Sequence, residues 1–248
     1  MSPNDSIWKN RLYNSYVSSG QVRSAADDSD ADAFFDSRGA YLRRMIAQYV
    51  PRDRQARILD LGCGHGAILH FLKRAGYCNV AGVDVSAEQI MQAHELGIPE
   101  ARRGQIITCL DEAPPGSTDV IILFDLLEHL TRTELFSIAD RTFRALKKGG
   151  ACIVHVPNAE GIYGLRARYG DLTHEQAFTP QSLRQLLTTV GFGSVECFED
   201  KPGVHGFRSA IRWLLWELGT MPHRVLLAAE TGNIRFILSQ NMLAVAKK

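Results

Sequence analysis

Short apolar runs alternate with amphipathic segments along most of this 248-residue chain, and this alternation limits the fold more than any other feature. The apolar runs expected to form strands are Arg57–Leu61, Val80–Val85, Gln105–Cys109, Asp119–Phe124 and Ala151–Val156. The segments with helical periodicity are Ala67–Ala75, Ala87–Leu96 and Thr133–Leu146. Continuous apolar strands are typical of parallel sheets, because helical crossovers cover both faces of such sheets. The pattern predicts an α/β fold with a Rossmann-like sheet and helices on both faces.

The C-terminal part is expected to complete a seven-stranded sheet. A helix over Pro180–Val190 is predicted, because Thr179 can cap it, proline suits its first position and Gly191 can end it. Two more strands are expected at Ser194–Phe198 and Phe236–Ala246. We expect these two strands to pair antiparallel at one edge of the sheet.

The domain organisation follows from this pattern. Residues 1–40 are polar and rich in Ser, Asp and Ala, and are interpreted as a partly mobile N-terminal arm. Residues 41–248 are interpreted as one domain that starts with a helix over Tyr41–Val50. An additional helical stretch at 207–229 should be broken by Gly219 and Pro222.

The charge balance and the N-terminus bear on partners and location. Lysine and arginine number 28 against 27 acidic residues, so no global basic field favours nucleic acid, and no nucleic-acid partner is expected. The N-terminus lacks the basic start and apolar stretch of a signal peptide, and no apolar run is long enough to span a membrane. These features predict a soluble, cytoplasmic protein.

A glycine-rich turn follows the first expected strand. Glycines at 62, 64 and 66 come directly after Asp60, where they allow backbone N–H groups to approach a ligand closely. Asp84 ends the next strand, at the position where such folds present a carboxylate to ribose hydroxyls. The third glycine of a dinucleotide fingerprint is missing, and the charge of Asp60 would repel a pyrophosphate. A cationic ligand that carries an amino group suits the turn better.

These residues resemble the class I S-adenosylmethionine-dependent methyltransferases, whose first motif is D-x-G-x-G-x-G. The resemblance covers roughly residues 41–198 and implies that Asp60 lies near the methionine amino group and Asp84 on the ribose. It also implies that residues 109–111 and Phe124 surround the adenine and sulfonium, with Glu112 as an alternative to Asp111. We interpret the N-terminal arm as a lid that closes over the bound donor through Tyr13 or Tyr16. The donor-binding residues expected in this way are Tyr16, Asp60, Gly62, Cys63, Gly64, Gly66, Asp84, Val85, Leu110, Asp111 and Phe124.

A second group of residues is expected on the acceptor side, which includes residues 157–180. Asp125, Glu128 and His129 lie within one helical turn after a strand, and His174 lies on a loop before a helix. They can act as general bases on a hydroxyl, His174 being favoured over His129, or hold Mg²⁺ or Mn²⁺. The pattern is similar to the E-x-x-E-H metal sites of ubiquinone-pathway and small-RNA methyltransferases, although Asp125 stands where those have Glu.

The nature of the acceptor was inferred from a further resemblance. The segments around Asn158 and residues 166–183 look like methyltransferases of bacterial lipopolysaccharide, O-antigen and exopolysaccharide synthesis. The residues expected to hold a sugar hydroxyl or its phosphate are Asn158, Tyr163, Arg166, Arg168 and Tyr169.

Three functions therefore stay open at this point. The first is an S-adenosylmethionine-dependent O-methyltransferase acting on a sugar or glycan precursor. The second is a catechol-type or quinone-type O-methyltransferase of small molecules, and the third is a catalytically idle donor-binding subunit. The 207–229 stretch is expected to cover the core or form a homodimer, with peripheral contact to a membrane-linked substrate as the alternative.

Overall fold

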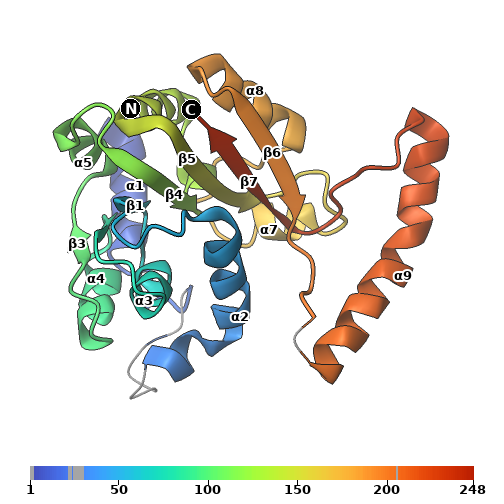
Figure 1. Ribbon diagram of the computed structural model, residues 1–248, viewed down its shortest axis with the longest axis horizontal. Helices are drawn as coiled ribbons and strands as arrows, with labels where there is room; N and C mark the ends of the chain where they lie inside the picture. The colour runs from blue at the N-terminus through green and yellow to red at the C-terminus, as the bar shows by residue number, and fades with distance from the viewer. Residues whose placement is uncertain (1–2, 22–23, 25–30, 205) are drawn as a thin grey trace.

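A computed structural model describes residues 3–21, 24, 31–204 and 206–248 (Figure 1). Residues 25–30, which carry most of the acidic run of the expected arm, lie outside the described residues. The boundary expected at residue 40 falls inside a continuous helix, α2 (Ala31–Tyr49). The described part of the arm also contains a helix, α1 (Pro3–Tyr13).

The described strands form one seven-stranded sheet in the order β3-β2-β1-β4-β5-β7-β6. Their bounds are β1 Ile58–Leu61, β2 Val80–Asp84, β3 Ala101–Arg103, β4 Thr118–Phe124, β5 Leu146–Pro157, β6 Ser194–Glu199 and β7 Asn241–Lys247. Strands β1 to β5 pair in parallel, whereas β7 runs antiparallel to both β5 and β6. The predicted Rossmann-like sheet with an antiparallel edge is confirmed.

Helices cover both faces of this sheet (Figure 1). One face packs against α2, α3 (Ala67–Arg74) and α4 (Ala87–Glu95). The other packs against α5 (Ile106–Glu112), α6 (Arg132–Ala145) and α8 (Pro180–Val190). A short 3-10 turn, η2 (Leu127–His129), and a short helix, α7 (Gly164–Arg168), lie in the connections beyond β4 and β5. The alternation of strands and helices therefore places the parallel strand ends and their connections at one edge, where the site forms.

Two expectations about secondary structure are wrong. Residues 105–109 form the start of helix α5 rather than a strand, and the strand at that point is the short edge strand β3. A short apolar run cannot by itself distinguish a buried strand from a buried helix. Here Ile106 and Leu110 are both buried, four residues apart on one helical face.

The second error concerns the stretch at 207–229, which is one continuous helix, α9 (Phe207–Thr231), despite Pro222 inside it. Proline removes the hydrogen bond to the carbonyl four residues earlier, that of Leu218. Because Leu218 lies on an exposed face, water can solvate that carbonyl, which lowers the cost of the proline. No helix in the described ranges is long and apolar enough to cross a membrane.

Candidate active site

The glycine-rich turn between β1 and α3 has a backbone that only glycine adopts easily. Gly64 has φ of +54°, and a Cβ at this position would lie 2.6 Å from the Oε1 atom of Gln89. The Gly64 N–H donates to the Oδ2 atom of Asp84 at 2.9 Å, and the Ser86 N–H donates to Oδ1 at 2.8 Å. These bonds fix the Asp84 carboxylate at the end of β2, beside the turn.

Asp60, at the end of β1, is the most unusual group of the turn. Its side chain is 1% exposed, and neither carboxylate oxygen has a hydrogen-bond partner among the described residues. Burial, together with the charge of Asp84, raises the pKa of Asp60 to about 8. Burying an ionised carboxylate without a partner costs free energy. A ligand that carries a positive charge would therefore be stabilised beside this carboxyl group.

A large cavity of about 1080 Å³ opens beside the turn. The structure brings most of the expected donor-site residues to its wall, namely Tyr16, Asp60, Gly62, Cys63, Gly64, Asp84, Val85 and Phe124. Gly66 is not part of the wall; it precedes the first residue of α3 with φ of +85° and packs against Ile98. The cavity is also lined by α1 and by the loop before α8.

Leu110 and Asp111 do not reach the cavity, in contrast to the sequence expectation. Leu110 is buried in the core beneath α5. Asp111 faces outward and accepts a hydrogen bond from Arg141 at 2.9 Å, which lowers the pKa of its carboxyl. Because this segment is a helix rather than a strand, Gln105 and Ile106 line the cavity instead.

Three acceptor-side residues converge in the same cavity. Glu128 and His129 from η2 and His174 from the loop after α7 each offer a ligand atom, and these atoms lie within 4.8 Å of one another. Glu128 is fully buried, and its Oε2 atom has no hydrogen-bond partner in the described chain. Burial, followed by the charge of Asp125, raises the pKa of Glu128 well above its ordinary value. The two imidazole rings and the carboxyl group therefore face a common point.

The hydrogen bonds of the two histidines fix which ring nitrogen is free. The Thr173 hydroxyl donates to Asp171 at 2.6 Å, so it accepts a hydrogen bond from Nδ1–H of His129 at 2.7 Å. His174 directs its Nδ1 to the carbonyl of Ala167 at 3.0 Å and therefore donates there. Within the described residues no partner is present for either Nε2. Both lone pairs are free to bind a metal or accept a proton.

Burial lowers the pKa of His129 to about 4, with the nearby His174 adding to the effect. At neutral pH the His129 ring is therefore uncharged. A neutral imidazole with one nitrogen anchored and the other free is the form that coordinates divalent cations. The donor set of Glu128, His129 and His174 fits such a cation.

Asp125 does not join this group, although the sequence suggested that it would. It has φ of +51°, which is rare for a residue with a side chain. Its carboxylate bonds to Nδ1 of His155 and, at 3.0 Å, to Arg38. His155 also bonds to Asp200 at 3.1 Å. Asp125 is thus held by α2 and β5 and is directed to this polar network.

His155 is protonated in this network. Burial alone would lower its pKa, but the charge of Asp125 and the hydrogen bonds to Asp125 and Asp200 outweigh burial and raise the pKa to about 9. The ring stacks on Phe124, with ring centroids 4.1 Å apart. The network therefore supports Phe124, which lines the cavity at the end of β4. No sequence signal brings His155 and Asp200 together, because their contact depends on the antiparallel edge.

The N-terminal helix α1 and the turn after it supply further cavity residues. Lys9 carried no signal in the sequence, whereas Tyr13 and Tyr16 were expected only as parts of a lid. Lys9 donates to the carbonyl of His129 at 2.9 Å and pairs with Glu175 at 3.0 Å. The Tyr16 hydroxyl donates to Asp171, the residue that also holds Thr173. Tyr13 places its ring edge-on to that of His129, with centroids 6.3 Å apart. The arm is thus connected to the acceptor-side cluster.

Four of the five residues expected to hold a sugar do not line the cavity. The side-chain amide of Asn158 is buried and donates to the carbonyls of Ile237 and Ser239. Arg168 donates to the carbonyls of His174 and Glu175. Tyr163 and Tyr169 are exposed and do not line the cavity, whereas Arg166 does.

Comparison with known proteins places this geometry in a family. The methyltransferase domain family matches residues 34–196. The chain belongs to this methyltransferase family. A structure of an S-adenosylmethionine-dependent methyltransferase from Archaeoglobus fulgidus has a TM-score of 0.66 at 23% identity and covers 86% of this chain and 94% of its own. That likeness shows the shared fold.

Two curated relatives are named ubiquinone biosynthesis O-methyltransferase. The one from Chelativorans is 29% identical over 175 residues, which is 61% of this chain and 67% of the relative. The one from Brucella anthropi is 28% identical over 193 residues, 69% of this chain and 75% of the relative. The matches with two further proteins of the same name cover only 56% and 61% of their lengths.

S-adenosylmethionine is the cofactor of this methyltransferase, and the residues present fit it. The unpartnered Asp60 carboxyl group suits the ammonium group of the methionine part. The Gly64 turn leaves room that a Cβ would fill, and Asp84 lies beside it with a carboxylate of the kind that suits ribose hydroxyls.

Proposed function

We propose that this methyltransferase transfers the methyl group to a hydroxyl oxygen of a small aromatic acceptor of the catechol or quinone-precursor type. The cluster of Glu128, His129 and His174 beside the donor site carries this proposal. The names of the curated relatives support the same acceptor class. The sugar acceptor expected from the sequence has no such support, and Asn158 and Arg168 are committed to backbone carbonyls.

The donor side of the cavity binds the methyl donor and orients it. S-adenosylmethionine, when bound, supplies an electrophilic methyl group on a sulfonium. Asp60 would hold the ammonium group and Asp84 the ribose, while Phe124 offers an apolar ring at the cavity wall. Fixing the donor beside the acceptor removes much of the entropic cost of bringing two reactants together.

The acceptor side prepares the hydroxyl. Glu128, His129 and His174 would hold Mg²⁺ or Mn²⁺, which lowers the pKa of a hydroxyl and orients it. The neutral ring of His129 offers the lone pair of Nε2, and Thr173 keeps the proton on Nδ1. His174, with Nδ1 bound to Ala167, offers its own Nε2 in the same way and serves as the alternative proton acceptor.

The N-terminal arm excludes water from this arrangement. Lys9, Tyr13 and Tyr16 all line the cavity and come from one segment of the arm, residues 9–16. The bonds of Lys9 to the His129 carbonyl and of Tyr16 to Asp171 attach the arm to the acceptor side. Closure of the arm would shield the sulfonium from competing solvent.

The test is methyl transfer from radiolabelled S-adenosylmethionine to a panel of acceptors. The panel contains a catechol, a monophenol, a nucleotide sugar and a polysaccharide fragment, each with Mg²⁺, Mn²⁺ or a chelator. We expect the catechol to be methylated, and the rate to fall at least about 100-fold in His129→Ala. Asp111→Asn serves as the control and should retain full activity, because Asp111 lies outside the cavity.

Methylation of the nucleotide sugar alone would replace the proposed acceptor class. Donor binding without transfer to any acceptor would instead favour a catalytically idle subunit. If the catechol is methylated equally fast with a metal ion and with a chelator, the reaction does not use a cation. The histidines would then act as the proton acceptors.

A further inference from the structure

Helix α9 stands at the side of the molecule, in the connection between β6 and β7 (Figure 1). It is 25 residues long, yet only Ser209 and Thr220 among its side chains are fully buried. A soluble helix of this length normally buries a whole apolar stripe against the core. The way α9 is attached explains which of its faces remains outside.

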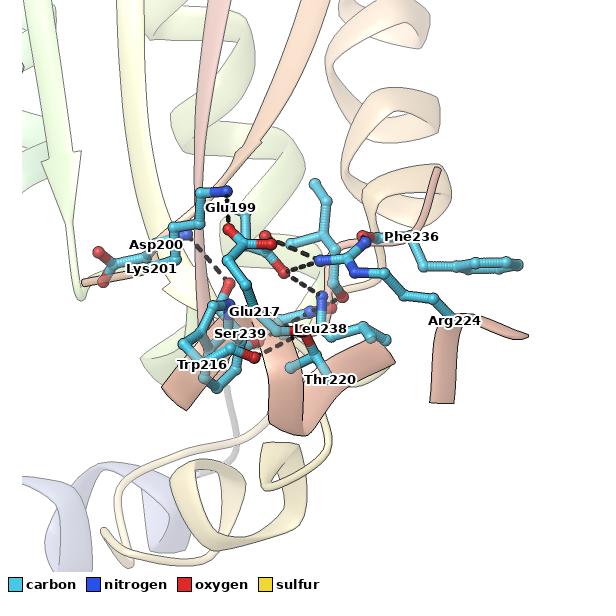
Figure 2. A network of polar contacts seen from close by, with 12 residues as sticks. Glu199, Asp200, Lys201, Trp216, Glu217, Thr220, Arg224, Phe236, Leu238 and Ser239 are labelled. Atoms are coloured by element: carbon cyan, nitrogen blue, oxygen red, sulfur yellow. Dashed lines mark hydrogen bonds and ion pairs between the residues drawn. The ribbon is translucent and has the colours of Figure 1, made fainter. Parts of the chain in front are cut away.

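Polar contacts attach α9 to the body (Figure 2). Arg224 donates to both carboxylate oxygens of Glu199, at 2.9 and 3.0 Å, and to the carbonyl of Phe236 at 2.7 Å. Glu217 pairs with Lys201. Glu199 also accepts the N–H of Leu238 at 2.9 Å, which connects the helix to the chain that follows it. These contacts fix the rotation of α9 about its axis.

The opposite face of the helix is apolar and exposed. Its residues follow one another at alternating distances of four and three positions, and their exposed fractions run from 43% to 82%. The residues of this seam are Phe207, Ile211, Leu214, Leu218, Met221 and Val225. With 3.6 residues per turn, they lie along one side, roughly opposite Ser209 and Thr220. Alternating four and three spacing is the pattern of a helix that packs against another helix.

We propose that this seam is a self-association surface, on which α9 of one chain packs against α9 of a second copy. A second copy offers the same narrow apolar stripe, so each seam covers the other in a two-fold arrangement. The exposed part of the six side chains, with Leu215 beside them, amounts to about 500 Å² per copy. A pair then buries about 1,000 Å², the lower limit for a specific interface.

The polar residues of α9 favour a helix over a lipid surface as the occupant. Helices that lie on membranes usually carry many Lys and Arg residues along their polar face. α9 has three arginines, two glutamates and no lysine. Arg224 and Glu217 are bound to the body (Figure 2), which leaves Arg208 and Arg212 as the exposed arginines of the helix.

The test is the mass of the full chain by sedimentation equilibrium between about 1 and 100 µM, a range that covers the affinities of weak to moderate interfaces. The seam variant carries Leu214→Glu and Val225→Glu, two exposed positions whose change leaves the core intact. The matched control carries Arg212→Glu, an exposed position on α9 outside the seam, and changes the charge of the chain by the same two units. Circular dichroism and binding of S-adenosylhomocysteine show that all three proteins are folded.

We expect the wild type and the control to form a dimer. The seam variant should dissociate with a constant at least about 100-fold larger, because two charges per copy would be buried without partners. A monomeric wild type at 100 µM overturns the proposal, as does a dimer that survives in the seam variant. Vesicles of phosphatidylglycerol and phosphatidylcholine are tested in parallel. Binding of a monomeric wild type to them would assign the seam to lipid instead.

Discussion

Replacement of Thr173 by valine tests how the structure prepares His129. The Thr173 side chain is 1% exposed, and its hydroxyl lies 2.6 Å from Asp171 and 2.7 Å from Nδ1 of His129. Valine keeps the shape but leaves a buried carboxylate with one bond fewer and a buried N–H without an acceptor. Summing these losses, we expect the free energy of unfolding to fall by about 2–4 kcal/mol.

The same change should affect catalysis more than donor binding. Without the Thr173 hydroxyl, nothing keeps the proton of His129 on Nδ1, and its Nε2 is no longer reliably free. Loss of such a supporting hydrogen bond typically reduces metal affinity or activity by about 10–100-fold. Urea denaturation gives the stability, and labelled methyl transfer with saturating donor gives kcat.

Thr173→Ser is the matched control, because serine retains the hydroxyl and loses only a methyl group. It should keep at least half of the wild-type kcat. If Thr173→Val unfolds within about 0.5 kcal/mol of Thr173→Ser and has the same kcat, the hydroxyl does not fix the ring of His129. The free Nε2 of His129 would then not depend on Thr173.

Three further predictions concern other parts of the site. Asp60→Asn should bind S-adenosylmethionine about 10–100-fold more weakly by calorimetry, yet melt at a higher temperature than the wild type at pH 8 without ligand. In the folded protein the pKa of Asp60 is raised to about 8, so burial of this carboxyl lowers the free energy of unfolding more and more as pH rises from about 4 to 8. Equal melting temperatures of the wild type and Asp60→Asn at pH 8 would contradict this. The pKa of His155 is raised to about 9, so the protonated ring stabilises the folded state. This contribution to the free energy of unfolding is fully present below about pH 6.5 and is lost as pH rises through 9. The contribution is up to about 3 kcal/mol, and urea denaturation from pH 6 to 10 should show it in the wild type but not in His155→Gln. Tyr16→Phe removes the bond to Asp171 and should raise the KM for the donor about fivefold with kcat little changed; an unchanged KM would separate the arm from donor binding.

The proposed donor site could be predicted from the sequence because its geometry is local. Asp60, Gly64 and Asp84 lie at the ends of two adjacent parallel strands, and the order of strands and helices fixes that edge. Glu128 and His129 follow the next strand for the same reason. Even the distant His174 was expected, because the loop before α8 lies at the same edge.

Other parts of the site depend on tertiary contacts that no local pattern encodes. The apolar run at 105–109 fits a strand or a helix equally well, and its assignment as a strand led to the expectation that Asp111 faces the cavity, whereas it faces outward to Arg141. Asp125 turns to His155 because Arg38 and Asp200 come from α2 and from the end of β6. The role of Thr173 appears only when its distances to Asp171 and His129 are known.

The most direct test of the account is the binding of Mn²⁺ to the protein loaded with S-adenosylhomocysteine, followed by electron paramagnetic resonance. We expect one ion bound per chain, lost in His129→Ala and in Glu128→Gln but retained in Asp125→Asn, because Asp125 is directed to His155. Binding that persists without His129 and Glu128, or no binding by a wild type that methylates a catechol, would contradict the proposed role of the Glu128, His129 and His174 cluster.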